Sequence, residues 1–458
     1  MQKNDVTQLL ITGLTHEGHG VGRVDGRAVF VPRTAPGDEV EAKILKVNPA
    51  YAHGRVERLL TPSPHRVEND CPVFGRCGGC ALRHISYPTE LEIKQSWVSE
   101  NLARIGKVFP DWEPIQPSPK IQRYRNKAQY PVRLVEGRVR TGFFAPRSHA
   151  LIPVEDCILH PEFFADICRA VCAFCEEKAI PPYDEAGHTG LLRQVCIRHG
   201  EATGQTLVCL VVNGKTFPFA EALGQRLEKL CPGPLSFHVN RNRERTNVIM
   251  GSHTRHVSGP GAIEDVLAGV RVRLSPQSFY QVNREAAELL YKTALEYADP
   301  SADHTLLDLY CGAGVIGLSM AERVGSLIGV ESVPQAVEDA SQNASLGGIT
   351  NARFICASAA QAAQELKEQG VRPDTIIVDP PRKGLCSETI EQLAAMSPAK
   401  IVYLSCNSAT LARDCAALAK KGYRAVRGRA VDLFPRTAHV ECVVQLVADS
   451  LAIERGVN

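Results

Sequence analysis

The stretch that decides the fold is TLLDLYCGAGVIGLSMAERV, residues 305–324. Its apolar start has the composition of a buried strand, and its end has that of a helix. Gly312, Gly314 and Gly317 lie between the two. Glycine permits a tight turn and lets a ligand approach the backbone closely. The stretch therefore predicts the strand, turn and helix that begin a nucleotide-binding α/β domain.

The same alternation continues towards the C-terminus. Apolar segments LIGVE, DTIIVD and IVYLSC alternate with Ala-rich segments such as AVEDASQNA and ETIEQLAAM. Repetition of strand and helix predicts a doubly wound, mostly parallel, Rossmann-like sheet. Glu331 ends the next strand, 331 − 312 = 19 residues after Gly312, where a carboxylate can accept from two ribose hydroxyls. These features indicate an adenosine-type ligand, and both NAD and S-adenosylmethionine fit them.

Three further side chains are predicted to meet at the carboxyl edge of this sheet. Asp379 begins the sequence DPPR, in which the prolines form a rigid ledge after a strand. A similar tetrapeptide with an aromatic last residue marks enzymes that methylate exocyclic amino groups, but Arg382 stands at that position here. Cys406 ends the following strand, and Glu441 in AHVECVVQL begins the last one.

A thiol, a carboxylate and a methyl donor together suit methylation of a pyrimidine ring carbon. Carbon 5 of uracil is a weak nucleophile, but addition of a thiolate to carbon 6 makes carbon 5 nucleophilic enough to accept a methyl group. A base must then remove the proton from carbon 5 so that the thiol can leave. We assign these roles to Cys406 and Glu441, with Asp379 placed to hold the base or the donor.

The length of 458 residues suggests about three domains. Residues 1–60 have short alternating strands separated by glycines, which predict a small β-barrel. Residues 61–265 are mixed and predict an α+β domain, and residues 266–458 form the predicted catalytic domain. No apolar run is long enough to cross a membrane, and the N-terminus has no secretory pattern, so we expect a cytoplasmic protein. We also expect a monomer.

Sixteen cysteines in such a chain indicate thiols, metal sites or catalysis rather than disulfides. Three of them form CPVFGRCGGC, with the spacing C-x5-C-x2-C, and the glycines let the loop fold around one centre. The best candidate for a fourth ligand is in PVEDCILHP. We expect a metal or cluster held by Cys71, Cys77, Cys80 and Cys157, although spacing alone does not separate iron-sulfur from zinc.

A second cysteine array suggests a different class of enzyme. Cys168, Cys172 and Cys175 match C-x3-C-x2-C, the pattern of radical S-adenosylmethionine enzymes. Their surroundings, FFADICRAVCAFCEEKA, have the composition of a helix rather than a loop. The three thiols are therefore expected on one buried helix face.

The net charge of 52 − 50 = +2 conceals a basic segment. Residues 120–150 include one acidic residue, Glu136. They include eight basic residues: Lys120, Arg123, Arg125, Lys127, Arg133, Arg138, Arg140 and Arg147. Aromatic residues lie among them, namely Tyr124, Tyr130, Phe143 and Phe144, and a second run carries Arg241, Arg243 and Arg245. Cations for phosphates and aromatic rings for unstacked bases predict binding of single-stranded or looped RNA, with the target base flipped out.

Over nearly its whole length the sequence resembles the RNA 5-methyluridine methyltransferase family, and in particular its 23S ribosomal RNA (uracil-5-)-methyltransferase branch. The resemblance rests on the cysteine loop and on SPQSFYQVN, LDLYCGAG, GVE, DPPRKG, LSCN and AHVE, which occur in the family's order. It implies an N-terminal, OB-like TRAM barrel and a 4Fe-4S cluster bound by Cys71, Cys77, Cys80 and Cys157. It also implies an S-adenosylmethionine site lined by Gln281, Tyr310, Glu331 and Asp379, with Cys406 as nucleophile and Glu441 as general base. Some members carry Asn at the position of Val315.

Three alternatives remain at this point. The same chemistry on the T-loop of transfer RNA would use the same motifs, because these motifs do not encode which RNA is presented. The other two are a radical S-adenosylmethionine enzyme and an RNA-binding protein without catalytic activity. The barrel together with the cluster favours ribosomal RNA, and the cluster is expected to have a structural or RNA-positioning role.

Overall fold

The computed structural model describes residues 1–449 and divides into two compact units. The N-terminal unit consists of Met1–Trp97, Phe143–Ile152 and Phe434–Val440. The C-terminal unit consists of Val98–Gly142, Pro153–Leu433 and the chain from Glu441 on. Within residues 1–449, no helix is both long and apolar enough to cross a membrane.

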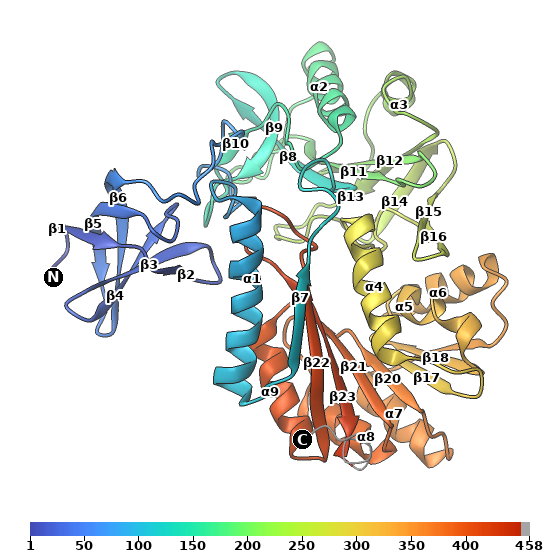
Figure 1. The fold of residues 1–458 in the computed structure, drawn as a ribbon. Coiled ribbons are helices and arrows are strands. Elements are labelled where there is room, and N and C mark those ends of the chain that lie inside the picture. Colours follow the sequence, from blue (N-terminus) through green and yellow to red (C-terminus); the bar gives the residue numbers. More distant parts are fainter. Residues whose placement is uncertain (450–458) are drawn as a thin grey trace. The chain divides into compact units, whose positions relative to one another are not determined.

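The N-terminal unit begins with a six-stranded sheet in the order β1-β5-β6-β4-β3-β2, drawn in blue in Figure 1. Its strands are β1 (Val6–Leu10), β2 (Gly13–Leu14), β3 (His19–Val24), β4 (Arg27–Pro32), β5 (Glu39–Val47) and β6 (Tyr51–Thr61). Alternate residues such as Val29, Val31 and Ile44 are fully buried, because successive side chains in a strand point to opposite faces. The Thr12 N–H donates to the Val21 carbonyl at 2.8 Å, which extends the short β2–β3 pairing by one residue.

The helix α1 (Tyr87–Asn101) follows the cysteine loop. A buried ion pair joins Glu90 to Lys94 at 2.7 Å on this helix. Lys94 Nζ also donates to the Phe434 carbonyl, and Glu90 Oε1 accepts from the Arg436 N–H. The segment Phe434–Val440, which comes immediately before Glu441, is thereby fixed to α1.

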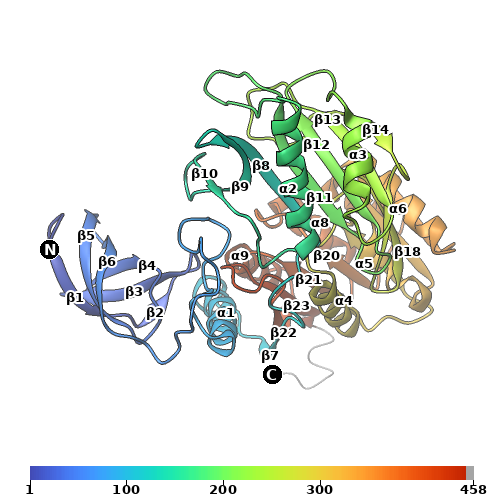
Figure 2. The same ribbon diagram turned by 90° about the horizontal axis from the view of Figure 1, so that it is seen from above.

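The C-terminal unit contains a seven-stranded sheet in the order β10-β9-β8-β11-β12-β13-β14. Helices α2 and α3 cover one face of it (Figure 2). These elements are β8 (Lys127–Val135), β9 (Arg138–Phe144), β10 (Leu151–Pro153), α2 (Glu162–Glu177), β11 (Leu192–His199), β12 (Thr206–Val212), α3 (Ala220–Glu228), β13 (Leu235–Arg241) and β14 (His253–Ser258). A separate hairpin, β15 (Ile263–Leu267) and β16 (Val270–Leu274), leads into the next sheet.

The eight-stranded sheet has the order β19-β18-β17-β20-β21-β23-β22-β7 and carries helices on both faces (Figure 1). Its strands are β17 (Thr305–Leu309), β18 (Ser326–Glu331), β19 (Ala352–Cys356), β20 (Thr375–Val378), β21 (Lys400–Ser405), β22 (Tyr423–Val431), β23 (Glu441–Ala448) and β7 (Asp111–Gln116). Its helices are α4 (Arg284–Ala298), α5 (Val315–Leu318), α6 (Pro334–Leu346), α7 (Ala359–Glu368), α8 (Ser387–Met396) and α9 (Ser408–Ala419). The predicted alternation of strand and helix from residue 305 onwards is confirmed.

Two features of this sheet were not predicted. Strand β23 runs antiparallel to both β21 and β22, so the parallel sheet has an antiparallel side. Strand β7, from the predicted middle segment of residues 61–265, pairs in parallel with β22. Short edge strands with mixed polarity such as DWEPIQ carry little periodic signal, which is why β7 was missed.

Candidate active site

The glycine-rich turn joins β17 to α5. Tyr310, Gly312 and Gly314 have φ angles of 65°, 53° and 79°, in the left-handed region that glycine tolerates best. The Gly317 N–H donates to Asp308 Oδ2 at 2.9 Å. This close approach requires glycine, because a Cβ atom on residue 317 would lie only 2.8 Å from the same oxygen. A Cβ on Gly312 would meet no atom within 4 Å, so the space above this glycine is open. The turn thus leaves room for a ligand against its backbone.

Glu331 ends β18, the parallel neighbour of β17. Its Oε2 accepts from the Gly312 N–H at 3.2 Å, and its Oε1 accepts from the Ser332 and Val333 N–H groups at 2.7 and 2.9 Å. The carboxylate is therefore tied to the glycine-rich turn, as expected for two strand ends at one sheet edge. A half-buried carboxylate at this edge can still accept from ribose hydroxyls.

Two other residues predicted to line the site of the methyl donor, Tyr310 and Gln281, come from different segments. The hydroxyl groups of Tyr310 and Thr389 lie 3.5 Å apart. Gln281 belongs to the loop SPQSFYQVN, whose backbone is fixed because the buried Asn126 donates to the Gln281 carbonyl at 3.0 Å. The Gln281 side chain hydrogen-bonds to the buried Tyr291, which has Asp379, Asp308 and Glu441 as charged neighbours. The loop therefore reaches the carboxylates of the sheet edge.

Cys406 and Glu441 are neighbours across an antiparallel ladder. Ser405, the last residue of β21, pairs with Cys442 of β23, so Cys406 follows and Glu441 precedes this pair on adjacent strands. Burial raises the pKa of the Cys406 thiol to about 11, and the nearby Glu441 and Asp379 carboxylates add to the effect. The Arg382 guanidinium opposes it by favouring the thiolate.

The carboxyl groups at this edge also have perturbed pKa values. Burial raises the pKa of Glu441 to about 8, and the Asp379 charge adds to it while Arg382 lowers it. Burial raises the pKa of Asp379 to about 7 and that of Asp308 to about 7. Clustered groups with shifted pKa values are typical of functional sites. A buried carboxyl with a pKa near neutrality is suited to accept or donate a proton.

A hydrogen-bonded frame holds the loop DPPRKG against α9. Asn407 caps α9 by accepting from the Ala409 N–H at 3.1 Å, and its Nδ2 donates to the Arg382 carbonyl at 3.0 Å. Asp414 Oδ2 accepts from the Leu385 N–H and from the Tyr403 hydroxyl, both at 2.7 Å. The nucleophile loop and the proline ledge are therefore one connected structure.

Sequence reasoning did not identify Asn407 or Asp414. An Asn directly before a predicted helix is the signal of an N-cap and could have pointed to Asn407. Asp414 carries no such signal, because it lies within the helix α9 and its partners are far away in the sequence.

The cysteine loop lies in the N-terminal unit. Cys71, Cys77 and Cys80 are half-buried, and the Gly79 N–H donates to Cys77 Sγ at 3.4 Å. Burial is the chief cause that raises the pKa of Cys77, and its neighbour Cys71 adds to the effect. Cys157 lies in the C-terminal unit and is also half-buried. Within residues 1–449, the structure gathers no three His, Cys, Asp or Glu side chains into a metal-binding group.

The second cysteine array lies on α2, which confirms the predicted helix. Cys168 and Cys175 are buried, and burial raises the pKa of Cys175 to about 12 and that of Cys172 to about 11. Thiols packed on a helix face do not form the flexible loop that a radical-enzyme cluster needs.

Several residues of the segment predicted to contact RNA are buried or form ion pairs within the protein. Tyr124 and Tyr130 are 1% and 4% exposed, so they do not offer rings to bases, and that part of the prediction is wrong. Strand alternation turns Tyr130 inward, where its hydroxyl contacts His160 Nδ1 at 3.0 Å. Arg123 pairs with Asp156 and Lys120 with Glu285, both at 2.6 Å. The basic residues of these two segments that remain exposed are Lys120, Arg138, Arg140, Arg147, Arg241, Arg243 and Arg245.

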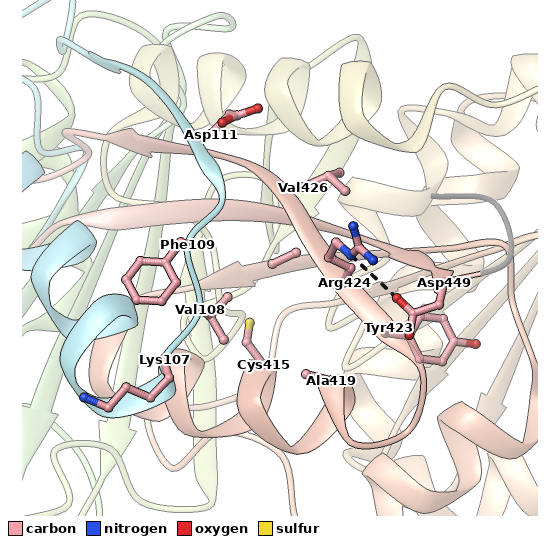
Figure 3. Close-up of a pocket in the computed structure, with 11 residues that line it drawn as sticks. Lys107, Val108, Phe109, Asp111, Cys415, Ala419, Tyr423, Arg424, Val426 and Asp449 are labelled. Atoms are coloured by element: carbon pink, nitrogen blue, oxygen red, sulfur yellow. Dashed lines mark ion pairs between the residues drawn. The ribbon is translucent and has the colours of Figure 1, made fainter. Parts of the chain in front are cut away.

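A cavity of about 320 Å³ lies at the start of β22 (Figure 3). Lys107, Phe109, Cys415 and Arg424 are among its lining residues, and Arg424 forms an ion pair with Asp449 at 3.7 Å. None of the predicted site residues lines it. The cavity is separate from the constellation around Cys406.

Two family models match segments of the chain, and known proteins match nearly its whole length. Residues 264–449 match the family model tRNA (Uracil-5-)-methyltransferase, and residues 2–56 match the TRAM domain. An uncharacterized RNA methyltransferase of Halalkalibacterium halodurans is 41% identical over 97% of this chain and 98% of its own. Another, from Listeria monocytogenes, is 39% identical over 97% of this chain and 98% of its own.

A solved structure resembles the whole chain. The Pyrococcus abyssi tRNA (uracil-54, C5)-methyltransferase, in complex with S-adenosyl-L-homocysteine, is 27% identical. The match covers 96% of this chain and 100% of that one, with a TM-score of 0.77. The fold and the glycine-rich turn thus define an S-adenosylmethionine-dependent methyltransferase. More particularly, the chain belongs to the RNA methyltransferase family whose members methylate uracil at carbon 5, and it carries an N-terminal TRAM domain.

Proposed function

We propose that this protein methylates carbon 5 of a uridine in 23S ribosomal RNA through a covalent bond between Cys406 and carbon 6 of the base. The observation that carries the proposal is the adjacency of Cys406 and Glu441 across the β21–β23 ladder, with Asp379 and Arg382 as charged neighbours. A thiol and a proton acceptor on adjacent strands can reach the two neighbouring carbons of one pyrimidine ring.

The first step is addition of the Cys406 thiolate to carbon 6 of uracil. The sulfur–carbon bond forms, and the electrons of the 5,6 double bond move towards oxygen 4 to give an enolate. With a pKa of about 11, the thiol is mostly protonated near pH 7. Arg382 offsets this by stabilising negative charge beside the sulfur.

The second step methylates the ring. S-adenosylmethionine would supply the methyl group: the bond from carbon 5 to the methyl carbon forms as the methyl–sulfonium bond breaks, and S-adenosylhomocysteine leaves. We propose that Gln281, Tyr310, Glu331 and Asp379 line its site, and the open space above Gly312 and the carboxylate of Glu331 fit an adenosine group. Glu441 then takes the proton from carbon 5, the carbon–sulfur bond breaks, and the Cys406 sulfur leaves as the 5,6 double bond reforms.

Two cysteine variants test this chemistry. One removes the half-buried thiol of Cys406, and the other removes the exposed thiol of Cys386. Cys406→Ala should abolish methyl transfer and leave binding of S-adenosylmethionine within about twofold of wild type. The control Cys386→Ala removes an exposed thiol at the start of α8 and should leave turnover unchanged. Turnover by the Cys406→Ala variant would contradict the mechanism.

The proposed substrate rests on the TRAM domain together with the cysteine loop, the combination through which the sequence resembles the 23S branch. The T-loop of transfer RNA is a second candidate, favoured by the likeness to the tRNA (uracil-54, C5)-methyltransferase of Pyrococcus abyssi. Mapping 5-methyluridine in ribosomal and transfer RNA from cells lacking this protein separates them. Loss from 23S RNA alone supports the proposal, whereas loss from transfer RNA alone replaces it.

We also propose that Cys71, Cys77, Cys80 and Cys157 bind a 4Fe-4S cluster. Four half-buried thiols and an N–H donated to Cys77 Sγ support it, because such hydrogen bonds accompany cluster sulfurs. The described residues hold no ready-made group of three ligands, so no step of the reaction is assigned to the cluster. Iron and sulfide content of anaerobically purified protein tests the proposal, with Cys77→Ser as the variant and Cys231→Ser as the control. Equal iron in both variants would overturn it.

A further inference from the structure

The outer surface of the N-terminal barrel carries three neighbouring rings. Phe30 lies on β4, and Tyr51 and His53 lie on β6. The ring centroids are 5.4 Å apart for Phe30 and Tyr51, 5.7 Å for Phe30 and His53, and 5.4 Å for Tyr51 and His53. We call these three residues the aromatic platform. Tyr51 is 38% exposed although it is a large ring.

The platform lies on the outer face because of strand register. Paired residues on adjacent strands share a face of the sheet. One row consists of Arg23, Ala28 and Tyr51 on β3, β4 and β6, and the next consists of Val21, Phe30, His53 and Lys46. The residues between them, such as Val29 and Ala52, point inward and are fully buried. The partner of Tyr51 on β4 is Ala28, which has a small side chain.

Cations flank the aromatic platform. Arg23 closes one row on β3, where its side chain donates to the Gly26 carbonyl at 2.8 Å. The exposed Lys46 closes the other row on β5. A third row pairs Lys43 with Arg55, and Arg55 contacts Glu57 at 2.8 Å. The aromatic platform is therefore bordered by positive charge. The rest of β6 differs, because its arginines form ion pairs with nearby glutamates.

We propose that the aromatic platform binds unpaired bases of a single-stranded RNA segment, while the flanking cations bind its phosphates. Bases stack on exposed aromatic rings without regard to sequence, and basic residues beside them follow the backbone. Duplex RNA does not offer base faces, so the platform selects unpaired RNA. This proposal rests on RNA being the substrate, and it assigns to the barrel a contact separate from the methylated uridine.

The test uses the full-length protein and measures binding by fluorescence anisotropy. The probes are a labelled mixed-sequence single-stranded RNA of about 12 nucleotides, within the reach of such barrels, and a duplex of the same sequence. Tyr51→Ala should weaken binding of the single strand at least about fivefold, the lower limit for losing one stacked base. Tyr51→Phe should bind like wild type, and neither variant should change duplex binding.

The matched control is Leu59→Ala, because Leu59 lies on the same strand and is also 38% exposed. The proposal would be overturned if Tyr51→Ala bound the single strand as tightly as Leu59→Ala does. It would also be overturned if Tyr51→Ala lost as much affinity for the duplex as for the single strand. A single strand containing 4-thiouridine should crosslink to a residue of the platform under ultraviolet light, and crosslinks confined to other parts of the chain would count against it.

Methyl transfer is measured separately, so that failure of this proposal and failure of the proposed function are distinguishable. At saturating RNA, kcat of Tyr51→Ala should equal that of wild type while KM rises. Normal binding by the platform with no uracil methylation would contradict the proposed function alone.

Discussion

Cys406 and Glu441 lie next to each other, both just beyond one pair of the β21–β23 ladder, Ser405 with Cys442. Cys406 directly follows β21 and Glu441 begins β23, so the thiol and the carboxyl lie at the same edge of the sheet on adjacent strands. The antiparallel direction of β23 makes this possible, because a parallel strand at that position would place its first residue at the opposite edge.

Glu441→Gln should trap the reaction after methylation. Glutamine keeps the size of the side chain but cannot accept the proton from carbon 5, so the carbon–sulfur bond cannot break. A methylated RNA joined covalently to the protein should accumulate and migrate as a slow band on denaturing gels. The double variant Cys406→Ala, Glu441→Gln should give no such band, and free methylated product from Glu441→Gln at the wild-type rate would exclude Glu441 as the base.

The same carboxyl should make stability depend on pH. Burial raises the pKa of Glu441 from 4.5 to about 8 in the folded protein, so the unfolded chain loses this proton at lower pH than the folded one. The free energy of unfolding contributed by this group therefore falls as pH rises from about 4.5 to about 8.

Urea denaturation checks this dependence. Glu441→Gln should be more stable than wild type at pH 9, and the difference should shrink or vanish at pH 4.5. Glu338→Gln, which changes an exposed carboxyl on α6, should show no such dependence. A constant difference between Glu441→Gln and wild type across this range would contradict the raised pKa.

Asn407→Ala should slow catalysis by more than its effect on stability explains. The variant loses the cap of α9 and the hydrogen bond to the Arg382 carbonyl. Loss of a cap costs about 1 kcal/mol. Ser358→Ala removes a comparable cap, at the start of α7, without touching the DPPRKG loop. Both variants should lower the free energy of unfolding similarly, but only Asn407→Ala should lower kcat, and equal kcat values would argue against a positioning role.

Much of the fold follows from local patterns. The glycine-rich turn, the alternation after residue 305 and the helix bearing Cys168 are set by short-range periodicity and turn chemistry, which the sequence displays directly. The edge strand β7 and the antiparallel insertion of β23 depend on partners far away in the chain. No local pattern encodes such pairings.

The candidate site divides in the same way. The positions of Cys406, Asp379 and Glu441 at strand ends could be predicted from apolar runs in the sequence, whereas their roles in the reaction stay a prediction. The burial of Tyr130 could not be predicted, since a strand inside a mixed sheet buries aromatic residues that would suit RNA equally well, and neither could that of Tyr124 in the loop before β8. The frame built by Asp414 was hidden because its partners Leu385 and Tyr403 come from other segments.

The central claim is that Cys406 bonds to carbon 6 of the target uracil, and trapping on RNA that contains 5-fluorouridine tests it most directly. Fluorine at carbon 5 cannot be removed as a proton, so the adduct persists and can be located by mass spectrometry after digestion. We predict a peptide containing Cys406 that carries a methylated fluorouridine nucleotide, and none in Cys406→Ala. Methylation without any adduct on Cys406, or an adduct on another cysteine, would contradict the account.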